Sequence, residues 1–537
     1  MPNRRSFLTA IGAGYALANN TWAQAQREAR AATTSNSELF YTADTTYGKV
    51  QGMVNTGIRE FKGIPYGAPT GGKNRYMPPR KPAAWTGVKE CLAYGPISPQ
   101  TMAALTSDYS QLIEWDRHSA SGMGEDVLTL NVWTPGLNDG NKRAVLVSFH
   151  GGGFATGSGN GPQYDGGQLS RLADVVVVTV NHRLASFGYL HLADLGAPPE
   201  FAQAGVAGMM DLVASLEWVR DNITNFGGDP SKVMIFGQSG GGAKTSTMLA
   251  IPSAKGLFHS AGIQSGSTIR SSTREAGTKS AELLLAKLGI SKGNIADIQK
   301  LPWQQILEAQ TSLGGQAGFT PVVDGTILPH HPFDPAAPPE SATVPIIISN
   351  TLEDAALGLT NFDLTEEGLR TMMNQRYGAK AEPMLAMYRD RYPNKSPFLI
   401  QAQIVTDAGA RRSAILQAER KSEQGQSPAY MYLWNFASTG FGGKFGAVHG
   451  TDVSATFNSY RDAVGGAGAP DERALWERFA TSWVSMAKNA NPNCSKVPNW
   501  PGYDAKMRAT MIFDKETRVE NDPRSEIRKL WAEMPRA

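Results

Sequence analysis

Cysteine is nearly absent from this chain, which has only Cys91 and Cys494 among its 537 residues. Small secreted domains held together by disulfides are rich in cysteine, and cysteine-based metal sites need several copies, so both classes are excluded. The spacing of the two residues leaves open whether they pair. Two separate free thiols are the simpler interpretation.

An excess of charge of one sign is also lacking. The chain has 51 Lys and Arg against 48 Asp and Glu, and Arg4 and Arg5 alone contribute two units of its formal net charge of +3. Proteins that bind nucleic acid generally need a cationic excess to neutralise phosphates. We therefore expect no nucleic-acid partner.

Long hydrophobic runs are missing as well. No run reaches the roughly 18 apolar residues that a membrane-spanning helix requires. The N-terminal sequence MPNRRSFLTAIGAGYALANNTWAQA instead has the parts of an export signal. Arg4 and Arg5 form a positive region, residues 7–18 a short apolar stretch, and residues 23–25 an A-x-A cleavage site. The paired arginines before Ser-Phe-Leu resemble a twin-arginine signal.

These features predict three parts of the chain: an export signal peptide over residues 1–25, a polar segment over 26–37, and a single domain over 38–537. The alternative for the first part is an uncleaved N-terminal helix. With a cleaved signal and no membrane span, we expect a soluble protein exported to the periplasm or secreted.

What the chain does contain is a series of short apolar runs alternating with helical patterns. Nearly unbroken runs rich in β-branched residues are typical of strands buried on both faces. They occur at residues 144–149, 175–180, 233–236, 261–264, 344–349 and 431–436. Helical spacing of apolar residues covers 208–225 and 472–487, and residues 243–249 are compatible with a helix. The pattern predicts an α/β protein with a mostly parallel sheet covered by helices on both faces.

The region 271–343 differs from this alternation, because it is richer in helical patterns and in loops that contain proline. We expect it to be an insertion over the sheet edge, where a lid over the substrate is able to form.

The sequence GQSGG at residues 237–241 is the first candidate for chemistry. A G-x-S-x-G motif is weak alone in a chain with 57 glycines, but here a predicted strand precedes it and a predicted helix follows. Ser239 then lies on a strand–turn–helix elbow at the carboxyl end of a strand, where ligand sites of such sheets lie. We expect Ser239 to be a nucleophile.

An activated serine needs hydrogen-bond donors for the oxyanion that forms on its substrate. The sequence HGGGF directly follows the predicted strand 144–149, and its glycines allow a backbone to approach a ligand closely. We expect the N–H groups of Gly152, Gly153 and Gly240 to form an oxyanion hole. His150 precedes this loop, and we expect it to brace the backbone rather than to act as the base.

Chain order identifies the base, because elbow hydrolases have their triad in the order nucleophile, acid, histidine. The acid is expected after the strand 344–349, and His449 is the only one of eight histidines beyond that point. Glu353 and Asp354 both follow this strand, and either is able to orient the histidine. The spacing does not choose between them.

These motifs together resemble the type-B carboxylesterase family, which includes cholinesterases and bacterial para-nitrobenzyl esterases. The sequences FKGIPYGAP, EDVLTLNVWTP, HGGGF, NHRLASFGYL, GQSGGG and GAVHGTDV follow one another in the family's order and cover nearly the whole chain after the signal. The resemblance implies an α/β-hydrolase fold, with Ser239, His449 and an acid as triad. No metal or organic cofactor is implied.

The sequence departs from the family at informative positions. The family usually has Asp-Glu-Gly where this chain has Glu353-Asp354-Ala355, so an ungapped alignment makes Asp354 the acid, whereas a one-residue loop shift restores Glu353. Gln238 replaces a common glutamate, which makes a choline-like substrate less expected. Val127 replaces a disulfide cysteine, and Gly240 replaces an alanine.

Other charged residues match family positions that we interpret as braces of the fold: Glu125, Asp126, Arg183 and Asp211.

We therefore expect a serine hydrolase that cleaves small-molecule carboxylic esters through an acyl-enzyme. Two alternatives stay open: an amidase or carbamate hydrolase with the same triad, and a non-catalytic binding protein on an esterase fold. Gln238 and Phe154 are candidate substrate-binding residues, and Trp115 and Phe319 are further candidates for an apolar pocket wall. The physiological ester and the oligomeric state do not follow from the sequence.

Overall fold

A computed structural model of the chain describes residues 39–102, 107–113, 122–460 and 470–535. The predicted export signal, the polar segment over 26–37 and Trp115 lie outside these residues. Residues Thr42–Ala537 form one unit, which contains every residue of the predicted catalytic site.

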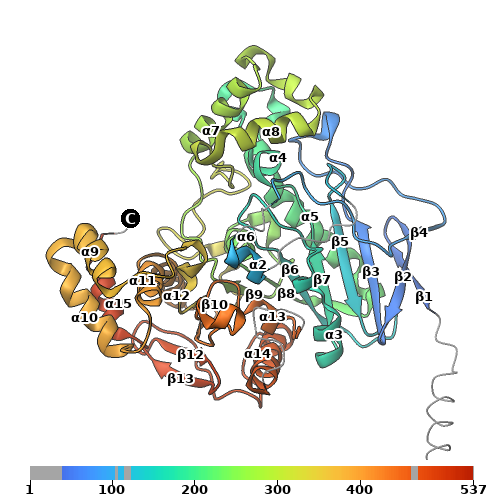
Figure 1. The fold of residues 1–537 in the computed structure, drawn as a ribbon. Helices are drawn as coiled ribbons and strands as arrows, with labels where there is room; N and C mark the ends of the chain where they lie inside the picture. Colours follow the sequence, from blue (N-terminus) through green and yellow to red (C-terminus); the bar gives the residue numbers. More distant parts are fainter. Residues whose placement is uncertain (1–38, 103–106, 114–121, 461–469, 536–537) are drawn as a thin grey trace, which may run out of the picture. The chain divides into compact units, whose positions relative to one another are not determined.

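The centre of this unit is a mixed sheet in which most neighbouring strands are parallel (Figure 1). The strands lie in the order β2-β3-β5-β7-β6-β8-β9-β10-β11-β12-β13, and β4 pairs with β2. All neighbours from β7 to β12 are parallel, and antiparallel pairs occur on both sides of this central part. The strands are β1 Phe40–Thr45, β2 Gly48–Asn55, β3 Ile58–Pro65, β4 Val88–Glu90, β5 Thr129–Thr134, β6 Arg143–Phe149, β7 Val176–Val180, β8 Gly228–Gln238, β9 Ser260–Gln264, β10 Ile346–Thr351, β11 Ala429–Trp434, β12 Ala509–Phe513 and β13 Arg518–Asn521.

The six strands predicted from apolar runs are confirmed as β6 to β11. Every residue of β6, β7, β9, β10 and β11 is buried, as expected for strands with helices on both faces. The strands on the N-terminal side of the sheet, β2, β3 and β5, were not predicted. They are antiparallel, and β2 and β3 have one partly exposed face, which leaves a weaker apolar signal.

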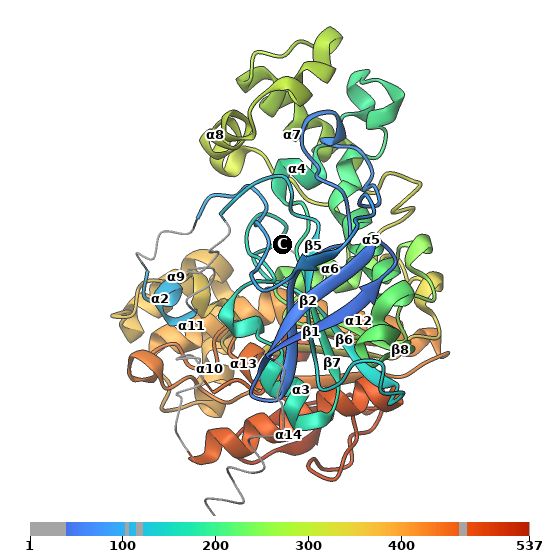
Figure 2. The same cartoon turned by 90° about the vertical axis from the view of Figure 1, so that its right-hand side faces the viewer.

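Helices cover both faces of the sheet (Figures 1 and 2). Helices α3 and α14 pack on one face, and α5, α6 and α12 pack on the other. The helices are α2 Asp108–Ile113, α3 Gly167–Ala173, α4 Ala185–Tyr189, α5 Ala207–Asn222, α6 Gly240–Met248, α7 Arg274–Lys287, α8 Trp303–Leu313, α9 Glu366–Tyr377, α10 Ala381–Arg391, α11 Pro397–Thr406, α12 Arg412–Gln424, α13 Val453–Thr456, α14 Pro470–Asn489 and α15 Ser525–Ala532. The helices predicted at 208–225, 243–249 and 472–487 are confirmed as α5, α6 and α14.

The prediction that the segment 271–343 is an insertion over the sheet edge, where a lid over the substrate is able to form, stays a prediction. This segment connects β9 to β10, which are neighbours in the middle of the sheet. Its helix α7 packs against α8 and against the turn Ala193–Leu195 that follows α4.

The parallel strands bring their carboxyl ends to one edge of the sheet. His150 follows β6, Ser239 follows β8, Ser265 follows β9 and Asp354 follows β10, each within a few residues of the strand end. Because parallel neighbours point the same way, these loops gather on one side of the sheet, where ligand sites of open α/β sheets lie.

Cys91 is buried and Cys494 is half-buried, and both are free thiols. The simpler interpretation of the two cysteines is therefore confirmed. In the described part of the chain, no helix combines the length and the apolar content needed to cross a bilayer.

Candidate active site

Ser239 lies in a sharp turn between β8 and α6. Its backbone has φ 59° and ψ −124°, a conformation that residues with a Cβ rarely adopt. Two hydrogen bonds hold the turn: Ser239 N donates to Gln264 O at 2.8 Å, and Ala243 N donates to Ser239 O at 2.9 Å. The side chain is partly exposed, whereas its neighbours in the chain are buried. A strained serine at a strand–helix junction is the geometry of a nucleophile elbow.

The glycines on either side of Ser239 allow this turn to pass close to the end of β6. A Cβ on Gly237 would lie 2.4 Å from Phe149 O, and a Cβ on Gly241 would lie 2.0 Å from the same atom. Real Cβ atoms do not approach so closely. The spacing of the G-x-S-x-G motif is therefore required by the packing of the elbow against its neighbouring strand.

The glycine loop after β6 contacts the beginning of α6. A Cβ on Gly240 would lie 2.2 to 2.4 Å from backbone atoms of Gly153, so the two backbones touch. Gly152 and Gly153 have φ values of 86° and 64°, which favour glycine. Gly240 is the first residue of α6, where backbone N–H groups have no partner within the helix.

The N–H groups of this loop differ in whether they are already bonded. Gly151 N donates to the hydroxyl of Tyr164 at 2.9 Å. Among the residues that the structure describes, the N–H groups of Gly152 and Gly153 have no hydrogen-bond acceptor. These two groups and the N–H of Gly240 are thus available next to Ser239.

His150 braces this loop, as predicted. Its Nδ1 donates to Gly151 O at 2.8 Å, and its ring stacks on that of His182 at 5.0 Å. The amine of Lys244, on α6, donates to His150 O at 2.8 Å. Burial and the nearby charge of Lys244 lower the pKa of His150 well below its usual value, so the ring stays neutral.

His449 and Asp354 form a buried pair after β11 and β10. Nδ1 of His449 donates to Oδ1 of Asp354 at 2.8 Å, and less than a tenth of either side chain is exposed. Burial opposes protonation of His449, but the charge and hydrogen bond of Asp354 outweigh it and raise the histidine pKa above 6.5. Burial also opposes ionisation of Asp354, but His449 and hydrogen bonds from Ser265 and Thr351 outweigh it and lower the carboxyl pKa.

Ser265 connects this pair to the elbow of Ser239. Its hydroxyl donates to Oδ2 of Asp354 at 2.6 Å. It follows Gln264, whose carbonyl accepts the N–H of Ser239. Sequence analysis missed Ser265, although its place directly after the predicted strand 261–264 put it at the same edge as Ser239.

Glu353, the alternative acid, points elsewhere. Its side chain is fully buried and accepts hydrogen bonds from Gln403 Nε2 at 2.7 Å and Ala447 N at 2.8 Å, and it pairs with Lys395. No contact between Glu353 and the His449 ring is found among the described residues. Of the two neighbouring carboxylates, Asp354 is the one at the histidine.

Two further residues close to His449 were missed by sequence analysis. The hydroxyl of Tyr109, on α2, donates to His449 O at 3.1 Å. Asp452 accepts a hydrogen bond from Tyr432 at 2.7 Å, and burial raises the pKa of its carboxyl. Asp452 stands in the GAVHGTDV motif, which offered a signal, whereas no pattern in the sequence pointed to Tyr109.

The candidate substrate-binding residues lie in different environments. Phe154 is half-buried next to the glycine loop, and its ring packs edge-on against Tyr189 at 5.4 Å. Gln238 is only 2% exposed, and its amide atoms have no hydrogen-bond partner among the described residues. Phe319 is 8% exposed, so its side chain belongs to the core.

Three of the four charged residues predicted as braces form ion pairs of the fold. Arg183 makes a bidentate pair with Asp211, with distances of 2.8 and 2.6 Å, in a fully buried position. Glu125 pairs with Arg75 through two contacts of 2.6 and 2.7 Å. The first pair holds the segment after β7 to α5, and the second holds the segment after β3 to the segment before β5.

A largely parallel sheet with a nucleophile elbow after β8 and a histidine–carboxylate pair after later strands defines an α/β-hydrolase. The model of the carboxylesterase family matches residues 41–531. The para-nitrobenzyl esterase of Bacillus subtilis is 33% identical over 90% of this chain and 97% of its own length. The phenmedipham hydrolase of Pseudarthrobacter oxydans is 29% identical over 88% of this chain and 95% of its own length.

A crystal structure of a carboxylesterase from Geobacillus stearothermophilus superposes with a TM-score of 0.78 at 32% identity, covering 91% of this chain and 99% of that one. The chain belongs to the carboxylesterase family. It is a carboxylic-ester hydrolase, and its substrates are small-molecule esters. The alternative of a non-catalytic binding protein is thereby wrong.

Proposed function

We propose that Ser239, His449 and Asp354 form the catalytic triad of this ester hydrolase. The observation that carries the proposal is the buried hydrogen bond of 2.8 Å between His449 and Asp354, at the sheet edge that also holds the elbow of Ser239. Asp354 fixes the tautomer of His449 with a proton on Nδ1, which leaves Nε2 free to accept a proton.

The reaction proceeds in two steps. Nε2 of His449 takes the proton of Ser239 Oγ as this oxygen bonds to the ester carbonyl carbon, and the carbonyl oxygen becomes an oxyanion. His449 then gives its proton to the leaving alcohol, so that the ester bond breaks and an acyl-enzyme remains. In the second step, His449 takes a proton from water as the water oxygen bonds to the acyl carbon. His449 then returns this proton to Ser239 Oγ, the bond between Oγ and the acyl carbon breaks, and the carboxylic acid is released.

The N–H groups of Gly152, Gly153 and Gly240 form the oxyanion hole in this proposal. Their support is the direct backbone contact of Gly153 with Gly240 and the absence of other acceptors for Gly152 and Gly153 in the described part of the chain. Fixed donors of this kind stabilise charge that develops in the transition state without reorganisation.

Replacement of Gly152 by alanine tests this function at the oxyanion hole. The new Cβ would lie 2.3 Å from Thr156 O at a φ of 86°, so the loop has to shift and its N–H groups move away from the substrate. We expect kcat for para-nitrophenyl acetate to fall by roughly 10²–10³, with KM changed only a few-fold.

Gly140→Ala is the matched control for this experiment. Gly140 has a similar φ of 74°, but it is exposed and a Cβ there meets nothing within 4 Å. An unchanged kcat in folded Gly152→Ala would contradict the proposed oxyanion hole.

The range of bonds that the triad cleaves stays a prediction. An amide or carbamate hydrolase is able to use the same residues, and kcat/KM for a matched ester and anilide measures the preference.

Phe154 stays a predicted wall of the substrate pocket, supported by its half-buried place next to the glycine loop. Gln238, being buried, is supported only as a neighbour of Ser239.

We further propose that residues 1–25 direct export through a twin-arginine pathway. The support is the order of Arg4-Arg5, a short apolar stretch and an A-x-A site in the sequence. Replacement of both arginines by lysine is expected to keep the precursor inside a bacterial host, whereas the original chain is found outside the inner membrane, shortened by 25 residues. Export of the double lysine variant at the original level would contradict the proposal.

A further inference from the structure

Glu353 lies between the loop of the proposed acid and the loop of the proposed base. Its N–H donates to Ala447 O at 3.0 Å, and its own carboxylate accepts Ala447 N at 2.8 Å. Glu353 and Val448 form an isolated parallel bridge. Asp354 directly follows Glu353 in the chain, and His449 directly follows Val448. The bridge therefore places His449 and Asp354, which share the 2.8 Å hydrogen bond, side by side.

The packing around this carboxylate leaves little room for adjustment. The side chain of Glu353 has no exposed surface. A Cβ on Gly446 would lie 2.8 Å from Oε2 of Glu353, and Gly446 has a φ of 62°. The histidine loop therefore passes directly over the carboxylate, so a change in the position of the carboxylate moves the loop.

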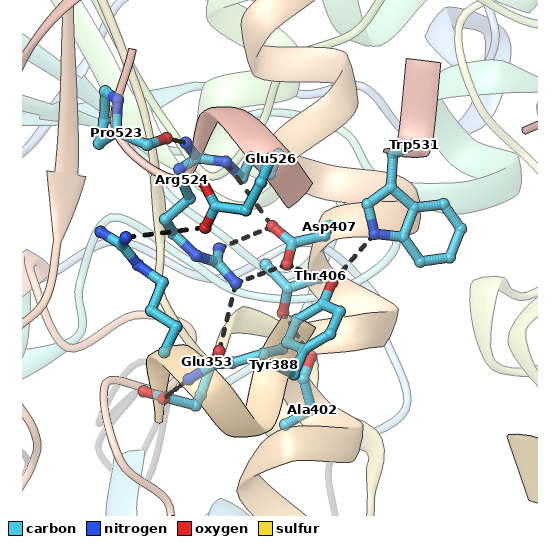
Figure 3. Close-up of polar contacts among 12 residues, drawn as sticks. Glu353, Tyr388, Ala402, Thr406, Asp407, Pro523, Arg524, Glu526 and Trp531 are labelled. Carbon is cyan, nitrogen blue, oxygen red and sulfur yellow. Dashed lines mark hydrogen bonds and ion pairs between the residues drawn. The ribbon is translucent and has the colours of Figure 1, made fainter. Parts of the chain in front are cut away.

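A buried network of hydrogen bonds fixes Glu353 from the opposite side (Figure 3). Gln403, on α11, donates to Glu353 at 2.7 Å and accepts from Arg524 at 3.2 Å. Arg524 forms a bidentate pair with Asp407, with distances of 2.8 and 2.7 Å. Asp407 also accepts from Tyr388 at 2.7 Å.

The direction of these bonds matters. Gln403 uses its oxygen for Arg524, which is only a donor, so its nitrogen is committed to Glu353, which accepts. On the other carboxylate oxygen, the backbone N–H of Ala447 is also only a donor. The site requires a side chain at position 353 that accepts on both sides, and a carboxylate meets this requirement.

We propose that Glu353 is a positioning residue, which aligns His449 with Asp354 by joining α11 to the histidine loop. The inference rests on the proposed triad, because it assigns Glu353 a role in setting the geometry of that triad. Glu353 itself takes no proton and touches no substrate.

Glu353→Gln tests the inference, because it retains the shape but not the ability to accept on both sides. Its amide nitrogen meets Gln403 Nε2, and a flip of Gln403 only transfers the conflict to Arg524. We expect kcat to fall about 10- to 100-fold with KM changed less than about threefold, since a small misplacement of a catalytic group has an effect of this size. The acid limb of kcat/KM is expected to shift to lower pH, because a weaker Asp354 contact raises the His449 pKa less.

The double variant Glu353→Gln/Gln403→Glu restores the hydrogen bonds to Ala447, position 403 and Arg524, and leaves only Lys395 without its acceptor at position 353. The new amide at position 353 then accepts from Ala447 N and donates to the new carboxylate at position 403, which also accepts from Arg524. We expect a three- to tenfold recovery of kcat over Glu353→Gln and a partial return of the acid limb. A loss that came only from general destabilisation would not be reversed in this way. Glu477→Gln is the control, because Glu477 pairs with Lys496 at 2.7 Å on the exposed surface.

Two results would overturn the inference: a folded Glu353→Gln variant with kcat within twofold of the original, or a double variant no more active than Glu353→Gln. If Glu353→Gln does not fold, the variant Lys395→Met tests the inference instead. It removes a partner of Glu353 whose side chain is 26% exposed, so it disturbs the core less. A three- to tenfold lower kcat at constant KM then supports the inference, and an unchanged kcat overturns it. The variant His449→Ala is measured in parallel. If His449→Ala stays active, the proposed triad itself is wrong. If His449→Ala is inactive while Glu353→Gln is unaffected, only the positioning role of Glu353 is refuted.

Discussion

Replacement of Ser239 by alanine is expected to lower kcat for para-nitrophenyl esters by about 10⁶, which is the size of loss seen when a triad nucleophile is removed. In the proposed triad, the half-buried serine on its strained turn supplies the oxygen that carries the acyl group, and no hydroxyl replaces it in the variant. Residual catalysis would come from the oxyanion hole and from substrate binding alone.

The matched control for this prediction is Ser253→Ala. Ser253 is an exposed serine in the turn Pro252–Ala254, and its removal is expected to leave kcat unchanged. Both variants should retain the melting temperature of the original chain within a few degrees. A Ser239→Ala variant that keeps more than a tenth of the original kcat would refute the assignment of the nucleophile.

Replacement of Asp354 by asparagine is expected to lower kcat by about 10⁴, the scale found when a triad acid is replaced by its amide. Asparagine can present an N–H to Nδ1 of His449, which favours the wrong tautomer. It also removes the charge that stabilises the imidazolium formed during the reaction.

The pH dependence of the same variant gives a second readout. His449 has to be neutral to act as base, so kcat/KM falls as the pH drops through the pKa of His449, which Asp354 raises above 6.5. In Asp354→Asn this charge is lost while the burial that lowers the pKa remains, so the acid limb moves to lower pH. A mild effect of Asp354→Asn together with a loss of about 10⁴ in Glu353→Gln would exchange the roles of the two acids.

Much of the site was predictable from local sequence. The G-x-S-x-G elbow and the HGGG loop depend on glycines at fixed spacing, and the structure shows a direct packing reason for them at Gly237, Gly240 and Gly241. His449 followed from chain order, because it is the only histidine after the predicted strand that precedes the acid. These features are encoded within a few residues of each other or in the order of the chain.

The choice between Glu353 and Asp354 was not accessible in the same way. Adjacent residues in a turn point in different directions, and which one meets His449 depends on contacts from Gln403, Ser265 and Ala447. Those partners are distant in sequence from the turn. The resemblance to the family favoured Asp354, and its contact with His449 agrees with that preference.

The same limit applies to the fold. Apolar runs predicted the buried parallel strands, but the order of the strands in the sheet depends on tertiary packing. The helices α9 to α12 lie between β10 and β11 in the chain and include Gln403, and no local pattern assigned them a role. The network behind Glu353 therefore became visible only in the structure.

The most direct test of the account is covalent labelling of the purified enzyme with a serine-directed phosphonate, followed by intact-mass measurement and peptide mapping. The account predicts one phosphonyl group per chain, on the peptide that contains Ser239, with complete loss of ester hydrolysis and no labelling of Ser239→Ala. Inactivation with the label on a different residue, or an active enzyme that resists the phosphonate, would contradict it.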